Sequence, residues 1–174
     1  MLRSSILAAT VVACAILSAC SSPSSSSSGT SGCKAYDPGT LDLKTPTISF
    51  KTDVVAGVFN KSCGLSTSCH GSATASQGGL FLGGKDKLGS DASDVRKLIV
   101  GVASKDLPTM PFVTAGDPSK SFLLHKMDGD QCQFDAQCAG KDGCLQTMPQ
   151  GSDALPADRR DIVRRWIAQG AQDN

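Results

Sequence analysis

Several segments of the chain carry apolar residues at helical spacing, and none alternates for long in the manner of a β-strand. The first segment covers residues 52–63, with Asp53 as the expected N-cap. Its apolar stripe consists of Val54, Val55, Val58 and Phe59. Cys63 extends this stripe by one turn. The pattern predicts a helix that buries one face and ends at a cysteine.

Two further segments in the middle of the chain predict helices. Residues 91–101 place three apolar side chains on one face and end at Gly101, a residue that stops helices. The three are Val95, Leu98 and Ile99. Residues 116–129 have Asp117 as a cap, proline at the first helical position and Gly129 as a terminator. Both segments are therefore expected to be single helices.

The last helix is expected over residues 155–171, opened by Pro156 and ended by Gly170. Its apolar stripe consists of Ile162, Val163, Trp166 and Ile167. Between the helices the chain is irregular and rich in glycine, with at most a short extended piece near Phe81. The pattern predicts a small all-α domain with long irregular loops. A prosthetic group or several disulfides would help such a fold to complete its core.

The N-terminal segment predicts export. Arg3 precedes the apolar run "ILAATVVACAIL", which is too short to span a bilayer comfortably. The run ends in Leu-Ser-Ala-Cys20, which resembles the lipobox of bacterial lipoproteins. This resemblance implies that residues 1–19 are a signal peptide, that Cys20 is lipidated, and that Ser21 permits sorting to an outer membrane. An ordinary signal peptide or a membrane anchor is the alternative interpretation.

Residues 20–44 begin with a serine-rich run and are expected to form a flexible tether before a folded domain at residues 45–174. The protein would then face the periplasm or the cell surface, where disulfides persist. A net charge of +1 gives no argument for a nucleic acid partner. The near-match to a phosphate loop at residues 79–85 is followed by Asp86 instead of Ser or Thr, so no ATP site is expected.

The segment "KSCGLSTSCHG" suggests a redox cofactor. Cys69 and His70 are the second half of the CxxCH motif that attaches haem covalently, but Ser66 stands where the first cysteine is expected. The nearest upstream cysteine is Cys63. In a helix, side chains six residues apart would point about 120° away from each other. Both cysteines can serve one haem only if the segment between them leaves the helix. Such a loop also allows a Cys63–Cys69 disulfide, and a third arrangement attaches haem through Cys69 alone.

A methionine loop supplies a candidate for the opposite side of an iron atom. Met148 precedes a proline shortly before the last helix, the usual setting of a thioether iron ligand. A core methionine that fills a gap is the alternative, and Met110 competes for the ligand role. His125 lies within a predicted helix and is interpreted as structural, with iron ligation as the alternative.

In their order, these segments resemble bacterial cytochrome c-like domains over about residues 48–171. The segments that carry the resemblance are "VFNKSCGLSTSCHG", "GGLFL", "AGDPSKSFLLHKMDG", "TMPQG" and "RRDIVRRWIAQGA". The resemblance implies haem c, with Cys69 as the second thioether, His70 as the proximal iron ligand and Met148 as the distal one. Cys63 is the candidate for the first thioether. The chain departs from the family at Ser66 and in a cysteine-rich insert before Met148.

The cysteine count leaves two arrangements open. Besides Cys20, the mature chain contains Cys33, Cys63, Cys69, Cys132, Cys138 and Cys144. Three disulfides and no haem are possible in any of about 15 pairings. Haem on Cys63 and Cys69 would leave four cysteines, enough for two disulfides that stabilise the insert. Parity favours Cys63 and Cys69 acting together. An oxidising compartment favours disulfides over zinc in the insert.

These patterns predict a membrane-anchored c-type cytochrome-like protein that binds one haem and transfers single electrons outside the cytoplasm. Its partner would be another exported redox protein. We expect an electron carrier and not an enzyme, because Met148 would occupy the iron position that a haem enzyme keeps open. The alternative is a haem-free structural or binding lipoprotein that keeps the cytochrome c fold and is stabilised by disulfides.

Overall fold

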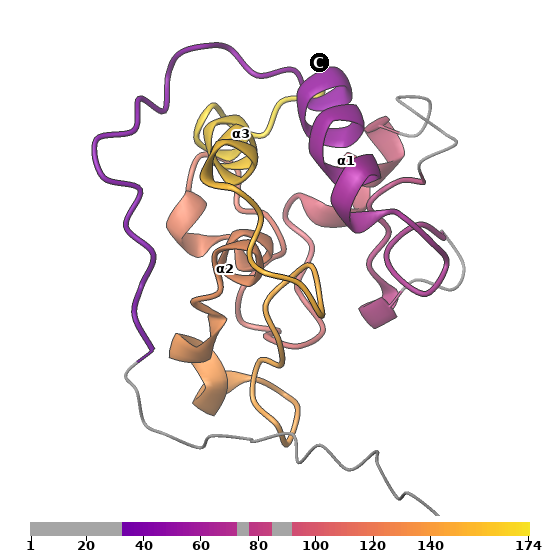
Figure 1. Cartoon of the computed structure of the whole chain (residues 1–174), viewed down its shortest axis with the longest axis vertical. Helices are drawn as coiled ribbons and strands as arrows, with labels where there is room; N and C mark the ends of the chain where they lie inside the picture. Colours follow the sequence, from indigo (N-terminus) through magenta and orange to yellow (C-terminus); the bar gives the residue numbers. More distant parts are fainter. Residues whose placement is uncertain (1–32, 73–76, 85–91) are drawn as a thin grey trace, which may run out of the picture. The chain divides into compact units, whose positions relative to one another are not determined.

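The computed structural model describes residues 33–72, 77–84 and 92–174 (Figure 1). Over these ranges the chain is helical and forms no β-strand, with isolated bridges joining Val100 to Val113 and Ala103 to Pro111. The elements are η1 (Phe50–Cys63), η2 (Gln77–Gly79), α1 (Ala92–Ile99), η3 (Pro118–Lys120), α2 (Phe122–Asp128), η4 (Gln131–Gln137) and α3 (Ala157–Ala168). This confirms the predicted helical class. The predicted signal peptide, Cys20 and the loop around Asp86 lie outside the described residues.

Helix η1 begins earlier than the sequence indicated. Its N-cap is Ser49 and not Asp53, since the Ser49 hydroxyl accepts the backbone N–H of Thr52 at 3.3 Å. The Asp53 carboxylate instead accepts the backbone N–H of Ser49 at 2.8 Å. Ser49 and Asp53 thus each use a side-chain oxygen to accept a backbone N–H at the start of the helix, in the manner of a capping box.

The turns of η1 are wider than those of an α-helix. The N–H of Val54 donates to the carbonyl of Ser49 at 3.3 Å, and the N–H of Gly64 to that of Phe59 at 2.7 Å. Bonds to the fifth preceding residue define π-helical winding. The predicted stripe is still buried, because its spacing suits the wider turn as well. The buried apolar side chains of η1 are Phe50, Val54, Val55, Val58, Phe59 and Cys63.

Helices η1 and α3 pack together at the centre of the core. The Phe50 ring stacks on the indole of Trp166, with centroids 4.4 Å apart and planes 18° apart, and meets the Phe59 ring edge-on at 6.4 Å. Val163 and Ile167 of α3 are fully buried, as the stripe predicted. Aromatic pairs of this kind contribute about 0.5–1.5 kcal/mol each beyond the area they bury.

The two middle helices differ in detail from the prediction. In α1, Val95 and Ile99 are buried, but Leu98 is 48% exposed and does not belong to the core face. The segment 116–129 is not one helix, because Ser121 is extended (φ −116°, ψ 101°) and separates η3 from α2. The Ser121 hydroxyl accepts the backbone N–H of Thr114 at 2.9 Å, a tertiary bond that holds the break open. The predicted Asp117 cap and the terminator Gly129 are both present.

Residues 33–44, which the sequence analysis assigned to the tether, lie against the domain. The Tyr36 ring is 4.2 Å from the guanidinium of Arg160 and 4.7 Å from that of Arg164 on α3. Arg165 donates to the carbonyl of Asp42 at 2.8 Å. In Figure 1 this indigo segment runs from η4, past α3, to the start of η1. None of the helices in the described ranges is long and apolar enough to cross a bilayer.

Candidate functional site

The chain between Cys63 and Cys69 leaves helix η1 and forms a loop that comes back beside the last residue of the helix. Helix η1 ends at Cys63, and the N–H of Cys69 donates to the carbonyl of Ser66 at 3.1 Å, which closes a turn. The N–H of His70 then donates to the carbonyl of Cys63 at 3.0 Å. This hydrogen bond places the Cys63 and His70 backbones side by side in spite of the wide spacing. The chain between the two cysteines has therefore left the helix, which is the condition that their wide spacing sets.

Glycines let a second segment pack closely against this loop. A Cβ atom on Gly64 would lie 1.8 Å from the carbonyl oxygen of Gly83, so only glycine fits there. Gly83 itself has a positive φ of 86°. The N–H of Leu82 donates to the carbonyl of His70 at 2.9 Å. Residues 80–84 are thus held along the loop that carries Cys69 and His70, although they form no strand.

The same segment orients the imidazole of His70. Its Nδ1 atom lies 2.9 Å from the carbonyl oxygen of Leu80. Because a carbonyl oxygen can only accept, we assign the proton to Nδ1, which leaves a lone pair on Nε2. A metal-binding histidine usually donates its other ring N–H in this way, which fixes the ring and raises its basicity. The contact with Leu80 therefore fixes the ring of His70 and leaves Nε2 as the nitrogen that could bind a metal.

A cavity of about 530 Å³ brings the predicted ligands together. Cys63, Cys69, His70 and Met148 all line it. Its wall is mainly apolar and includes Leu80, Leu82, Phe112, Leu123, Met127 and Leu155. The volume lies within the range of about 300–1,000 Å³ that is usual for ligand and cofactor sites. Four residues from the two ends of the domain sequence thus face one apolar space.

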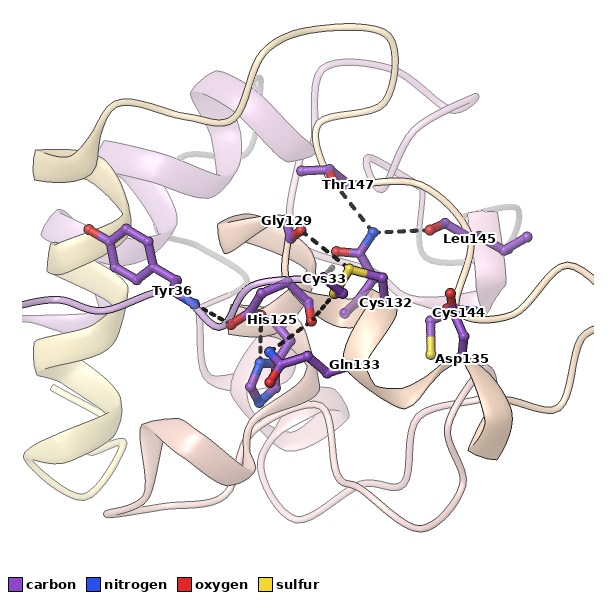
Figure 2. Close-up of a disulfide and its surroundings, with 12 residues drawn as sticks. Cys33, Tyr36, His125, Gly129, Cys132, Gln133, Asp135, Cys144, Leu145 and Thr147 are labelled. Atoms are coloured by element: carbon purple, nitrogen blue, oxygen red, sulfur yellow. Dashed lines mark hydrogen bonds and ion pairs between the residues drawn. A yellow bond between two sulfur atoms is a disulfide. The ribbon is translucent and has the colours of Figure 1, made fainter. Parts of the chain in front are cut away.

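Met148 is held at the cavity by backbone contacts. Its N–H donates to the carbonyl of Lys126 on α2 at 2.8 Å. The preceding loop is fixed by Gln131, whose Nε2 donates to the carbonyl of Leu145 at 3.0 Å and lies 3.5 Å from the Thr147 hydroxyl (Figure 2). The cysteine-rich insert, through Gln131, therefore helps to position the loop that ends at Met148.

The structure separates the competing methionines. Met110 does not line the cavity but packs in a second cluster with Leu107 and Phe122. Met127, which the sequence analysis did not consider, lines the cavity from α2 and is 1% exposed. Two methionines, Met127 and Met148, therefore line the cavity.

The two thiols of the site differ in their surroundings. Burial, helped by the nearby Cys69, raises the pKa of Cys63 to about 12. Cys69 is only half-buried, and the Ser66 hydroxyl donates to its sulfur at 3.4 Å. Ser66 therefore touches the sulfur of Cys69 from the position where a CxxCH motif has its first cysteine.

The other four cysteines within the described residues form two disulfides. Cys33 pairs with Cys132 (Cα–Cα 5.8 Å) and Cys138 with Cys144 (Cα–Cα 5.2 Å). All four disulfide candidates are confirmed, and the insert is crosslinked as expected. Cys63 and Cys69 remain as free thiols, so neither is linked to the insert. This is the arrangement with two disulfides and one pair of cysteines kept together.

His125 is engaged on both ring nitrogens. Nδ1 lies 2.7 Å from a carboxylate oxygen of Asp130, and Nε2 lies 3.0 Å from the carbonyl oxygen of Ser119 (Figure 2 shows the ring beside the disulfide). Burial opposes the charged form, but the bonds to Asp130 and Ser119 outweigh it and raise the pKa of His125. With both nitrogens bonded to acceptors, none is left for iron. This supports the structural interpretation of His125.

The sequence analysis missed a buried cation at the cavity. Lys126 is 6% exposed and lines the cavity, and its Nζ donates to the carbonyl of Cys144 at 2.7 Å. Burial lowers the pKa of Lys126, while Asp106 and Asp135 act in the opposite direction. A signal was present in the sequence, because Lys126 follows the apolar Phe122 by four residues and so shares its helix face.

Within the ranges that the structure describes, no cluster of three or more His, Cys, Asp or Glu side chains suits a metal ion. Haem iron does not need such a cluster, because one histidine and one thioether suffice when a porphyrin supplies the remaining ligands. Comparisons of the chain with protein-family models, curated proteins and solved structures give no match.

Proposed function

We propose that this protein is a c-type cytochrome-like electron carrier with one covalently attached haem. Cys63 and Cys69 would form the thioethers, and His70 and Met148 would be the proximal and distal iron ligands. The observation that carries the proposal is that these four residues, from two distant segments, line one apolar cavity. The helical fold and the η1–α3 packing are compatible with a cytochrome c-like domain.

The residues fit the proposed group in their chemistry. The hydrogen bond from His70 to Leu80 leaves Nε2 free as a donor to iron. The two cysteines of the site are the two that no disulfide uses. A thioether from Met148 favours the ferrous state relative to a second imidazole. When bound, the haem would supply one-electron chemistry at its iron, and the protein would supply ligands, orientation and exclusion of water.

The setting of the protein is part of the proposal. We infer a lipid anchor at Cys20, a position in the cell envelope at the outer membrane by the rule for Ser21, and an exported redox protein as electron partner. The two disulfides support a compartment in which thiols oxidise. We propose electron transfer and not catalysis, because Met148 would occupy the iron position that a haem enzyme keeps open.

The test is the spectrum of the protein made in a host with a haem-attachment system. The proposal predicts a red protein whose haem stays bound after denaturation and acid–acetone extraction. A colourless protein with free thiols at Cys63 and Cys69 would contradict the proposal. It would favour the alternative, a haem-free lipoprotein of similar fold, for which the replacement of the first motif cysteine by Ser66 is the supporting observation.

A further inference from the structure

The ammonium group of Lys126 is buried without a carboxylate partner. The residue is 6% exposed, and its Nζ has one hydrogen bond, to the carbonyl of Cys144 at 2.7 Å. The Phe122 ring lies below it, with the centroid 6.0 Å away. Among the described residues no acidic side chain forms an ion pair with it. Asp106, which also lines the cavity, and Asp135 raise the pKa of the ammonium group against the effect of burial.

A buried ammonium in this state lacks partners. It has three N–H donors, of which the Cys144 carbonyl takes one. Buried charges in folded proteins are otherwise paired, because an unpaired charge loses its hydration without compensation. The side chain reaches the cavity wall, so the missing acceptor can come from a ligand in the cavity.

The cysteine-rich insert builds this end of the cavity. The Cys138–Cys144 disulfide closes a short loop, and the N–H of Cys144 donates to the Asp135 carboxylate at 2.8 Å. These contacts fix the carbonyl that holds the Lys126 ammonium. The next residue, Leu145, lines the cavity. The insert thereby positions the Lys126 cation at one end of a cavity whose wall is mainly apolar.

We propose that Lys126 forms a carboxylate-binding subsite and that the cavity ligand is a tetrapyrrole with one acidic side chain placed against its Nζ. This inference rests on the proposed function for the identity of the ligand. It gives the cysteine-rich insert a role in ligand binding. The iron ligands alone do not account for the presence of this insert. It also gives the ligand one orientation in the cavity, because the acid must lie at the end formed by α2 and residues 138–145.

The test uses metal-free protoporphyrin IX and its dimethyl ester, which differ only in their carboxyl groups. Without iron, neither His70 nor Met148 can contribute through metal ligation. The full chain with Cys20→Ser is purified without a haem-attachment system, and each porphyrin is titrated by its absorbance. We expect the wild-type cavity to bind the diacid at least about tenfold more tightly than the ester, because the ester leaves the buried ammonium unpaired.

Two variants assign that preference to Lys126. Lys126→Met keeps the aliphatic stem and should reduce the preference to less than about twofold. Lys105→Met is the matched control, since Lys105 is an exposed lysine on the same cavity, and it should keep the preference. Circular dichroism confirms that each variant is folded. The comparison of the two porphyrins on the unchanged cavity decides the question even if Lys126→Met does not fold.

The outcomes separate this inference from the proposed function. Equal affinity of the wild-type cavity for diacid and ester would overturn the carboxylate subsite and leave the tetrapyrrole cavity in place. A preference that survives in Lys126→Met would overturn the role of Lys126. Failure to bind either porphyrin would overturn both the subsite and the proposed function.

Discussion

The Nδ1 atom of His70 lies 2.9 Å from the carbonyl oxygen of Leu80, ten residues further along the chain. The bond joins the cysteine loop to a segment that has no secondary structure of its own. That segment is kept in place by close backbone packing, where Gly64 meets the carbonyl of Gly83. The orientation of the imidazole therefore depends on two glycines that never touch it.

Substitution of Gly64 tests this dependence. In Gly64→Ala the new Cβ would lie 1.8 Å from the Gly83 carbonyl oxygen, so the two backbone segments must separate. We expect a loss of at least ~2 kcal/mol in the free energy of unfolding, measured by urea denaturation. Gly140→Ala is the control, because its Cβ would meet the nearest atom at 3.4 Å. Equal stability of the two variants would show that the contact is not tight in solution.

The thioethers can be tested one at a time. Cys69→Ser should abolish covalent haem retention if Cys69 alone is attached, and should leave haem on Cys63 if both are. Mass spectrometry of a digest identifies the modified cysteine in each case. The double variant Cys138→Ser/Cys144→Ser should keep its covalent haem, since that disulfide carries no thioether. Covalent haem that persists in a variant lacking both Cys63 and Cys69 would contradict the assignment.

The reactivity of the two free thiols should differ in the haem-free protein. At pH 8 iodoacetamide should label Cys69 first, because Cys63 is buried and its pKa is raised to about 12. In urea both should react, while the four paired cysteines should need a reductant. Peptide mass spectrometry after alkylation measures the labelling of Cys63, Cys69 and the four disulfide-bonded cysteines. Native labelling of Cys63 as fast as Cys69, or a peptide linking Cys63 to the insert, would refute the arrangement.

The distal ligand is tested at the two cavity methionines. Met148→Ala should leave haem attached, remove the weak sulfur–ferric charge-transfer band and lower the reduction potential. Met127→Leu is the control, because Met127 is a buried helix residue and leucine has a similar volume. This variant should keep the band. The reverse result would assign the ligand to Met127. In a haem-free protein the Met148 change would have no spectral effect and would cost up to about 2–5 kcal/mol.

The buried pair of His125 and Asp130 predicts a stability maximum in mildly acidic solution. The pKa of His125 is raised, so its contribution is complete below the ordinary value of 6.5 and is lost as the pH rises through the raised value. Despite burial, the bonds from His125 and the N–H of Tyr36 lower the pKa of Asp130. Its contribution is complete above 3.8 and is lost as the pH falls.

The difference in unfolding free energy between wild type and His125→Gln removes the contributions of groups that titrate alike in both proteins. We expect about 1–3 kcal/mol near pH 5 and a smaller difference at pH 9. Urea denaturation with the disulfides intact provides the measurement. A difference that does not change between these pH values would mean that His125 does not carry a charge in the folded protein.

The sequence predicted the elements better than their interruptions. Asp117, Gly129 and the stripe of α3 are local signals, and the structure has each of them. The break at Ser121 was missed because the bond that stabilises it comes from Thr114, outside the helix pattern. The π-helical winding of η1 was missed for a related reason, since a stripe spaced by four and five residues fits either winding.

For the candidate site, the sequence predicted which residues take part, but it did not predict what each of them contacts. The motifs pointed to Cys63, Cys69, His70 and Met148, and all four line one cavity. The acceptor for His70 is a backbone carbonyl, which no side-chain pattern can identify. The disulfide between Cys33 and Cys132 joins residues 99 positions apart, and spacing alone cannot select such a pair.

The burial of Cys63 also bears on the order in which the protein matures. Disulfides rearrange by attack of a thiolate, and burial raises the pKa of Cys63 to about 12, so its thiolate is scarce near neutral pH. Once η1 has packed, Cys63 is therefore withdrawn from exchange with the Cys33–Cys132 and Cys138–Cys144 bonds.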